Sequence, residues 1–152
     1  MANIMYYSKN VDKNKLDKLY QVTKKIEKDY PNHKNWFYDK FVKELDGKKR
    51  EIIYYEKDSV ICGVIFLKNT LEEKKICTVY VSEEYRKHGI GTKLLLESIK
   101  FLGTTTPLIS MPDYKEECFK NIINKYKWEK KQEIDNCYSN NKEIVFNGFL
   151  EV

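Results

Sequence analysis

Glycine and proline are scarce in this sequence, with six and three copies in 152 residues. Hydrophobic residues make up 41% of the chain and aromatic residues 14%. This composition argues against a fibrous repeat and against a disordered chain, because it supplies enough apolar surface to build a core. The length fits one domain, which we expect to span residues 1–152.

Long hydrophobic runs are missing as well. No apolar stretch approaches the about 18 to 20 residues that a membrane-spanning helix needs. The N-terminal segment MANIMYYSKNVDKNK has neither the basic start nor the apolar core of a secretion signal. We therefore expect a cytoplasmic protein with no membrane partner.

Arginine is nearly absent, since only Arg50 and Arg86 occur, and lysine supplies almost all of the basic charge behind the net value of +5. Lysine and glutamate alternate closely, as in KKIEKDY at residues 24–30, which is typical of solvated surfaces. Proteins that bind nucleic acids usually exploit arginine and concentrate their charge on one element. We expect no nucleic acid partner, whereas an anionic small ligand suits this charge.

The cysteines lack the spacing of a metal site. Cys62, Cys77, Cys118 and Cys137 form no C-x-x-C pair and have no histidine nearby. We expect no metal, and we expect reduced, mostly buried thiols.

The hydrophobic periodicity alternates repeatedly between strand and helix patterns. The segment VICGVIFL at residues 60–67 is apolar on both alternations, which predicts a strand at the centre of a sheet. Asp113 and Glu116 have the spacing of a helix capping box, and residues 139–141 predict a tight hairpin turn. The predicted strands are 4–8, 52–56, 60–67, 76–81, 107–111, 131–138 and 143–149, and the predicted helices are about 16–30, 36–46, 90–102 and 113–126. This order predicts an α/β (α+β) fold with one mixed sheet and helices on both faces.

The most informative stretch is ICTVYVSEEYRKHGIGTKLLLESI, a strand followed by a glycine-containing turn and an amphipathic helix. A helix start presents unpaired N–H groups and the positive end of the helix dipole, which together bind phosphate. Gly89 and Gly91 remove the Cβ atoms that would keep a pyrophosphate away, and Arg86 and Lys87 add positive charge. An isolated G-x-G can simply start a helix, but the strand and helix around this one favour phosphate binding.

At these residues the sequence resembles the GNAT superfamily of acyl-CoA-dependent N-acyltransferases. The family signature Q/R-x-x-G-x-G/A, at the start of the helix after the fourth strand, is matched by Arg86, Gly89 and Gly91. The resemblance is strongest from about residue 51 to residue 128. It implies a single domain with a mostly antiparallel sheet of about seven strands, in which the fourth and fifth strands splay apart.

The resemblance also implies how acetyl-CoA would bind. Backbone groups of Val79 and Val81 would pair with the pantetheine arm, and the Val79 N–H would donate to the thioester carbonyl as an oxyanion donor. The pyrophosphate would lie on the turn and helix start, formed by Arg86, Lys87, His88, Gly89, Ile90, Gly91 and Thr92.

A general base is harder to assign. Amine acylation requires a neutral amine, so a base removes a proton directly or through water. The resemblance suggests Glu73, near the start of the fourth strand, although Lys75 lines up better by spacing and the sequence favours a solvated loop glutamate over a catalytic one. His88 lies inside the phosphate turn, which argues against a catalytic role.

The general acid departs from the family pattern. Ile123 occupies the position where family members often carry a tyrosine. Tyr126, three residues later, is the nearest phenol but also fits the apolar stripe of its helix. Tyr114, Ser110 and Cys118 are further candidates, and water could also protonate the leaving thiolate.

We therefore expect an N-acetyltransferase that moves an acetyl group from acetyl-CoA to a primary amine of a small molecule, peptide or protein by direct attack. The alternative is an acyl-CoA-binding sensory module with weak or no catalysis. In the family the first two helices and the last strands form the acceptor site, which here would include Trp36, Phe37, Tyr38 and Tyr138. A place in the hydrophobic core fits these aromatics equally well. A homodimer is compatible with the sequence.

Overall fold

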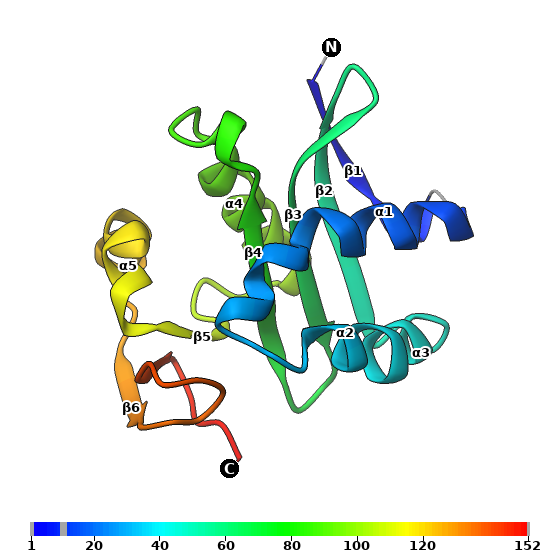
Figure 1. The fold of residues 1–152 in the computed structure, drawn as a ribbon. Coiled ribbons are helices and arrows are strands. Elements are labelled where there is room, and N and C mark those ends of the chain that lie inside the picture. Colours follow the sequence, from blue (N-terminus) through cyan, green and yellow to red (C-terminus); the bar gives the residue numbers. More distant parts are fainter. Residues whose placement is uncertain (1, 10–11, 152) are drawn as a thin grey trace.

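The computed structural model describes residues 2–9 and 12–151. One seven-stranded sheet with the order β1-β2-β3-β4-β5-β7-β6 organises the chain (Figure 1). Only β4 and β5 run parallel; the other neighbours are antiparallel. The strands are β1 (Ala2–Tyr6), β2 (Arg50–Lys57), β3 (Val60–Asn69), β4 (Lys74–Val81), β5 (Leu108–Pro112), β6 (Lys130–Ile134) and β7 (Glu143–Phe146). The predicted mixed sheet is confirmed.

The N-terminal helices cover one face of the sheet and lie in front of it in Figure 1. They are α1 (Lys13–Thr23), a 3₁₀ segment (Lys24–Lys28), α2 (His33–Asn35), a π-helical segment (Trp36–Phe41) and α3 (Val42–Leu45). Asp12 caps α1 by accepting a hydrogen bond from the Asn14 N–H at 2.9 Å. The core on this face is mainly aromatic, and Phe37, Phe41 and Phe66 are fully buried.

The opposite face is covered by α4 (Ile90–Leu102) and α5 (Lys120–Tyr126). Helix α4 has the predicted bounds, and Leu94, Leu95 and Leu102 are among the side chains that it buries against the sheet. Strand β3 contacts both layers, with residues 61–67 buried, as the apolar pattern predicted. No helix in the described ranges combines the length and hydrophobicity of a membrane span.

Several sequence predictions fail at element ends. The last strand, β7, stops at Phe146 and not at residue 149, and the helix predicted over about 16–30 is α-helical only to Thr23. Strand β1 stops at Tyr6, and Tyr7–Lys9 forms a 3₁₀ turn. Strand β6 stops at Ile134, and residues 135–142 form a longer loop in place of a tight hairpin turn. The loop begins where Asn136 adopts a left-handed φ of 51°, which a strand cannot continue through.

The predicted capping box is also wrong. Asp113 and Glu116 lie in a 3₁₀ segment (Asp113–Phe119) whose cap residue Pro112 makes no side-chain cap hydrogen bond. The Asp113 N–H donates to the Lys142 carbonyl at 2.8 Å, which extends the β5–β7 pairing and keeps Asp113 out of a cap position. Glu116 instead forms an ion pair with Lys130 at 3.1 Å.

The cysteines are all free, but only Cys62 is fully buried. Cys118 is exposed, and Cys77 and Cys137 are partly exposed. The expectation of mostly buried thiols is therefore wrong. Cys118 lies in the 3₁₀ segment that replaces the predicted helix start, which turns its side chain toward solvent.

Candidate functional site

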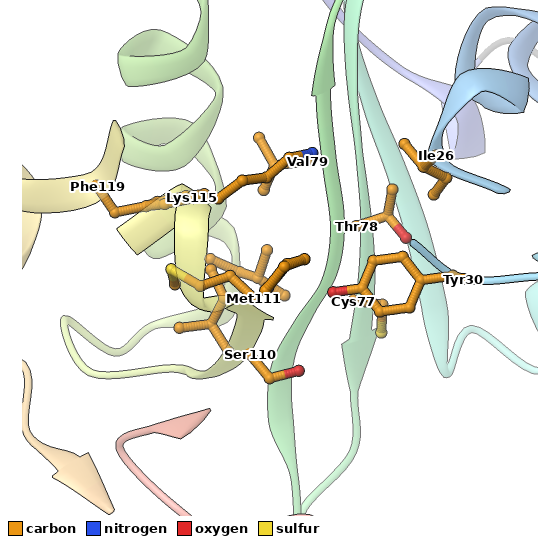
Figure 2. Close-up of a pocket in the computed structure, with 12 residues that line it drawn as sticks. Ile26, Tyr30, Cys77, Thr78, Val79, Ser110, Met111, Lys115 and Phe119 are labelled. Carbon is orange, nitrogen blue, oxygen red and sulfur yellow. The ribbon is translucent and has the colours of Figure 1, made fainter. Parts of the chain in front are cut away.

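Strands β4 and β5 separate soon after they meet. They pair only at Lys75 with Leu108 and at Ile76 with Ile109. Beyond these residues β5 turns away (Figure 1), and a cavity opens that Val79, Ser110 and other side chains line (Figure 2). This opening, which we call the β4–β5 gap, confirms the predicted splay.

A β-bulge in β4 accompanies the separation. Phe66 of β3 pairs with Thr78, and the next residue, Leu67, pairs with Ile76. Cys77 between them therefore has no partner on β3. A bulge bends its strand and increases the twist, so β4 stays paired with β3 while its other edge leaves β5.

The alternation of antiparallel pairing decides where the Val79 amide points. The Ser82 N–H donates to the Cys62 carbonyl at 2.9 Å, which makes these two residues a hydrogen-bonded pair. Since such pairs alternate with non-hydrogen-bonded ones, the backbone groups of Val79 and Val81 face away from β3 and toward the gap. The Val81 carbonyl accepts a hydrogen bond from Arg86 Nε at 2.8 Å, in agreement with this orientation.

The turn before α4 presents a run of backbone amides. Lys87 and Gly89 both have left-handed φ angles, of 66° and 79°. In the described part of the chain, the N–H groups of residues 87–92 have no hydrogen-bond partner, and the helix bonds begin with Lys93 donating to Gly89 at 3.0 Å. These groups lie at the positive end of a 13-residue helix.

The glycines leave open space beside these amides. A Cβ atom on Gly89 would meet no atom within 4 Å, and one on Gly91 would reach only the Val81 side chain, at 3.7 Å. A phosphate group can therefore approach the backbone where a side chain would otherwise stand. These features fit the pyrophosphate of coenzyme A.

The Arg86 side chain does not extend freely toward the expected phosphate site but contacts β4. Its guanidinium carbon is 5.5 Å from the centre of the Tyr80 ring, while Nε holds the Val81 carbonyl. Arg86 therefore braces the end of β4 against the turn. Lys87 and His88 are exposed next to the free amides, and the roles of all three at the pyrophosphate remain predictions.

Glu73 is engaged by basic groups. It lines a large cleft next to the gap, and its carboxylate is 2.9 Å from Lys68 Nζ. Burial alone would raise the pKa of Glu73, but the hydrogen bond and charge of Lys68, with the charges of Lys75 and Arg50, outweigh burial and lower it. A carboxylate with a lowered pKa is a weaker proton acceptor.

Among the candidates for the general acid, Ser110 lines the gap, whereas Tyr126, Tyr114 and Cys118 are not in its lining. Tyr126 is the last residue of α5 and packs, with Ile123, against the core on the α4 face. Neither residue is in the lining of the gap or of the large cleft. Tyr114 donates a hydrogen bond to buried Asp29, and burial together with this bond raises the pKa of Tyr114 to about 12.

The structure brings together three residues that sequence reasoning did not connect. Tyr30 and Ser110 line the gap, and each hydroxyl donates to the Glu143 carboxylate at 2.8 Å. Burial raises the pKa of Glu143, against the lowering effect of these hydrogen bonds. The residues are far apart in sequence, and the only signal of their proximity was the expected pairing of the last strands.

The large cleft has a volume of about 620 Å³ and shares five lining residues with the gap. Trp36 and Tyr138, two of the four predicted acceptor-site aromatics, line it. Phe37 and Tyr38 do not; Phe37 is fully buried, and the Tyr38 hydroxyl donates to Asp17 at 2.7 Å. The shared residues are Ile26, Tyr30, Cys77, Thr78 and Ser110.

Several solved structures share this fold. The ribosomal-protein-S18-alanine N-acetyltransferase of Escherichia coli superposes with a TM-score of 0.70 at 14% identity, over 96% of this chain and 92% of that one. Arabidopsis thaliana NAA60 in complex with acetyl-CoA gives 0.70 at 13% identity, over 96% and 97%. A GNAT-family acetyltransferase from Bacillus cereus gives 0.66 at 18% identity, over 96% and 95%.

The sequence comparisons agree with the structural ones. Curated protein sequences yield no match. A family model described as the Acetyltransferase (GNAT) family matches residues 14–105, which is more than half of the chain and includes β4, the turn and α4. With this match and the geometry of the gap, the chain belongs to the acetyltransferase (GNAT) family.

Proposed function

We propose that the chain transfers an acetyl group from acetyl-CoA to a primary amine by direct attack in a ternary complex. The observation that carries this proposal is the β4–β5 gap, where an unpaired edge of β4 meets an open cleft. Bound acetyl-CoA would supply an activated acyl carbon, so that a new C–N bond forms as the C–S bond breaks.

The binding roles follow the geometry of the chain. The amides of residues 87–92 would hold the pyrophosphate, because they are free and lie at a helix start. The backbone groups of Val79 and Val81 would pair with the pantetheine arm along the open edge of β4. Arg86 would fix the end of this edge through the Val81 carbonyl.

The Val79 N–H would donate to the carbonyl oxygen as negative charge develops on it. A fixed amide of this kind contributes ~3 kcal/mol to the stability of the transition state in acyl-transfer enzymes. The orientation of Val79, away from β3, supports this role because the amide is not needed for strand pairing.

Proton removal is best assigned to the Tyr30–Glu143–Ser110 group. Its two hydroxyls line the gap, and Glu143 can take a proton through either of them. The raised pKa of Glu143 suits a proton acceptor, whereas the lowered pKa of Glu73 does not. Tyr126 is a weak candidate for the general acid that protonates the leaving thiolate, because it lies outside the lining of the gap.

A second function is favoured by two specific observations. Ile123 carries no proton donor, and Glu73 is held in an ion pair. An acyl-CoA-binding module with weak or no catalysis would tolerate both features. Such a module would bind acetyl-CoA as tightly as an enzyme does, but would not release thiol with any amine.

A thiol-release assay with a panel of primary amines tests the proposed function, with calorimetric titration of acetyl-CoA alongside it. We expect binding with amine-dependent release of coenzyme A, and we expect Glu143→Gln to lower kcat by about a hundredfold while acetyl-CoA still binds. Binding without release for every amine would favour the sensory module. Absence of binding would contradict both functions.

A further inference from the structure

The large cleft has an excess of positive charge beside the reaction centre. Its lining contains four basic side chains, Lys40, Arg50, Lys68 and Lys75, and two acidic ones, Glu73 and Glu151. Five residues line both the cleft and the β4–β5 gap, so the cleft offers a path by which an acceptor amine would reach the gap.

Two of these basic groups are already neutralised by the protein. Arg50 Nε lies 3.1 Å from the Glu44 carboxylate, and its guanidinium is within 6 Å of the Trp36 and Phe41 ring centres. Lys68 is paired with Glu73 at 2.9 Å. Both cations therefore stabilise the lining of the cleft through contacts within the protein.

Lys75 is different. It is partly buried, it lines the cleft from β4, and its ammonium makes no ion pair or hydrogen bond with any residue in the described ranges. The ammonium is close enough to favour the charged forms of Glu73, which is already paired with Lys68, and of Cys77, Cys137 and Glu143. Lys75 thus faces the space between β4 and the C-terminal strands, and a partly buried cation is stabilised by an anionic partner.

We infer that the cleft selects acceptor amines that also carry an anionic group, a carboxylate or a phosphate, which Lys75 binds while the amine reaches the β4–β5 gap. The inference rests on the proposed function and names its substrate class. Exposed Lys40, which also makes no ion pair with the described residues, adds attraction at the rim, while exposed Glu151 at the other side opposes it.

The position of Lys75 sets the separation of the two groups. Lys75 and Val79 are four residues apart on β4, a rise of at most about 13 Å. The flexible side chain of Lys75 can bring its ammonium part of the way toward Val79. An acceptor whose amine and anion are separated by about five carbons covers the remainder, whereas the single carbon of glycine does not.

Matched compounds with a chain of five saturated carbons on the amine provide the test. They are 6-aminohexanoate, 5-aminopentyl phosphate, pentylamine and 1,5-diaminopentane, and glycine serves as the short carboxylate. We expect kcat/KM for the better of the two anionic compounds to exceed that for pentylamine by at least about tenfold, the worth of one charge-assisted hydrogen bond. The diamine should fall below pentylamine, and the two anionic compounds distinguish a carboxylate from a phosphate preference.

The variants assign the effect to one residue. Lys75→Met keeps the apolar stem, and it should reduce the anionic-to-neutral ratio of kcat/KM to near one. Lys100→Met, which changes an exposed lysine on α4, should leave the ratio at its original value. An unchanged ratio in Lys75→Met, or equal rates for the anionic compounds and pentylamine, would overturn the inference and leave the acetyltransferase proposal standing.

Equilibrium binding tests the preference for anionic acceptors even when no amine is turned over. Calorimetric titration of coenzyme A-loaded protein with 6-aminohexanoate, 5-aminopentyl phosphate and pentylamine should show tighter binding of an anionic compound, weakened in Lys75→Met. Absence of turnover with this binding pattern would contradict the proposed function alone. Equal binding of all three compounds would contradict the inference.

Discussion

Gly89 and Gly91, in the turn before α4 that we expect to bind the pyrophosphate, differ in their backbone conformation. Gly89 has a φ of 79°, so a branched residue there would strain the turn itself. Gly91 has no such constraint, and an added Cβ would make ordinary contact with Val81 at 3.7 Å. Gly91 is therefore the position at which a side chain can block the amides without disturbing the backbone.

We predict that Gly91→Val weakens acetyl-CoA binding at least about a hundredfold while the protein stays folded, because its methyl groups would occupy the space next to the free amides. Calorimetric titration measures the affinity, and circular dichroism checks the fold. Gly91→Ala is the matched control and should lose less affinity. Binding of acetyl-CoA by Gly91→Val at the original affinity would move the pyrophosphate site elsewhere.

His33 is a buried histidine in an aromatic cluster, stacked on Tyr20 with ring centres 5.7 Å apart. The Thr23 hydroxyl donates to the Tyr20 carbonyl at 3.0 Å and lies 2.9 Å from His33 Nε2. Since this hydroxyl has only one proton, His33 Nε2 must be the donor to it. Burial lowers the pKa of His33 to about 4, against the attraction of the Glu27 carboxylate.

A lowered pKa means that the unfolded chain binds the proton more tightly than the folded protein does. We therefore predict that the His33 contribution to the free energy of unfolding is complete above pH 6.5 and declines by about 3 kcal/mol as the pH falls to 4. Urea denaturation between pH 7 and pH 4.5 measures this decline. His33→Gln should flatten it, whereas the same change at exposed His88 should not.

Tyr126 provides a test of the alignment that the family resemblance suggested. Because its ring packs against the core beside α5 and is absent from the lining of the gap, we predict that Tyr126→Phe lowers kcat by less than about tenfold. Steady-state kinetics with a reactive amine measures it. A loss of a hundredfold or more with normal acetyl-CoA binding would identify Tyr126 as the acid.

At the scale of elements, the bulge at Cys77 and the pairing of β4 with β3 determine which amides are available. Val79 has its N–H toward the gap, whereas Thr78, one residue earlier, has its N–H in the ladder with Phe66. Proline removes the N–H at either position and tolerates only an edge or an unpaired place in a strand.

We predict that Val79→Pro leaves the protein folded and lowers kcat by about a hundredfold, because it removes the proposed oxyanion donor. Thr78→Pro should lower the melting temperature markedly, since it breaks a strand hydrogen bond. Circular dichroism and the thiol-release assay separate the two effects. Full activity in a folded Val79→Pro protein would exclude this amide from the reaction.

The element that sequence reasoning predicted best is α4. Its apolar positions repeat with helical spacing, and its start and end both lie at glycines with left-handed φ, Gly89 and Gly103. These signals are local. The bulge at Cys77 and the loop of residues 135–142 depend on which residues the neighbouring strands place opposite them, and no local pattern encodes that.

The candidate site divides in the same way. The free amides of residues 87–92 belong to one continuous motif, and the sequence alone was sufficient to predict where they are. The Tyr30–Glu143–Ser110 group joins three distant segments, so only the folded chain brings it together. The charge of the large cleft likewise comes from several elements and is invisible in the interspersed lysines of the sequence.

At the scale of the whole molecule, the separation of β4 and β5 leaves few backbone bonds between the two halves of the sheet. Polar contacts around Asp29 help to connect them on the side of the large cleft. Buried Asp29 accepts hydrogen bonds from the Tyr114 hydroxyl and, at 3.4 Å, from Asn141 Nδ2, and Lys115 Nζ lies 3.8 Å away.

We predict that Asp29→Ala lowers the free energy of unfolding by about 2 to 3 kcal/mol, because it removes a buried carboxylate that accepts hydrogen bonds from Tyr114 and Asn141 and attracts the Lys115 ammonium. Urea denaturation at pH 7 measures the change. Asp39→Ala, at an exposed carboxylate on the N-terminal helical layer, is the control and should change the stability by less than about 0.5 kcal/mol. Equal effects of the two substitutions would show that the Asp29 contacts do not connect the halves.

The β4–β5 gap gives the sheet an unusual internal edge. Unpaired edges normally lie at the outside of a sheet, where another chain can add a strand. Here the edge lies between two central strands, and Ile26, Tyr30, Lys115 and Phe119 are among the side chains around it, so a narrow extended ligand fits where a polypeptide strand does not. A ligand of that shape would act as a removable strand.

This arrangement reverses the usual order of backbone protection. In most sheets the amides of the central strands exchange with solvent last. In the ligand-free protein the Val79 and Val81 amides, at the centre of the sheet, should exchange early because they face the gap. Ligand binding would slow their exchange and raise the apparent stability in proportion to the logarithm of the ligand concentration, so the central strands become fully protected only in the complex.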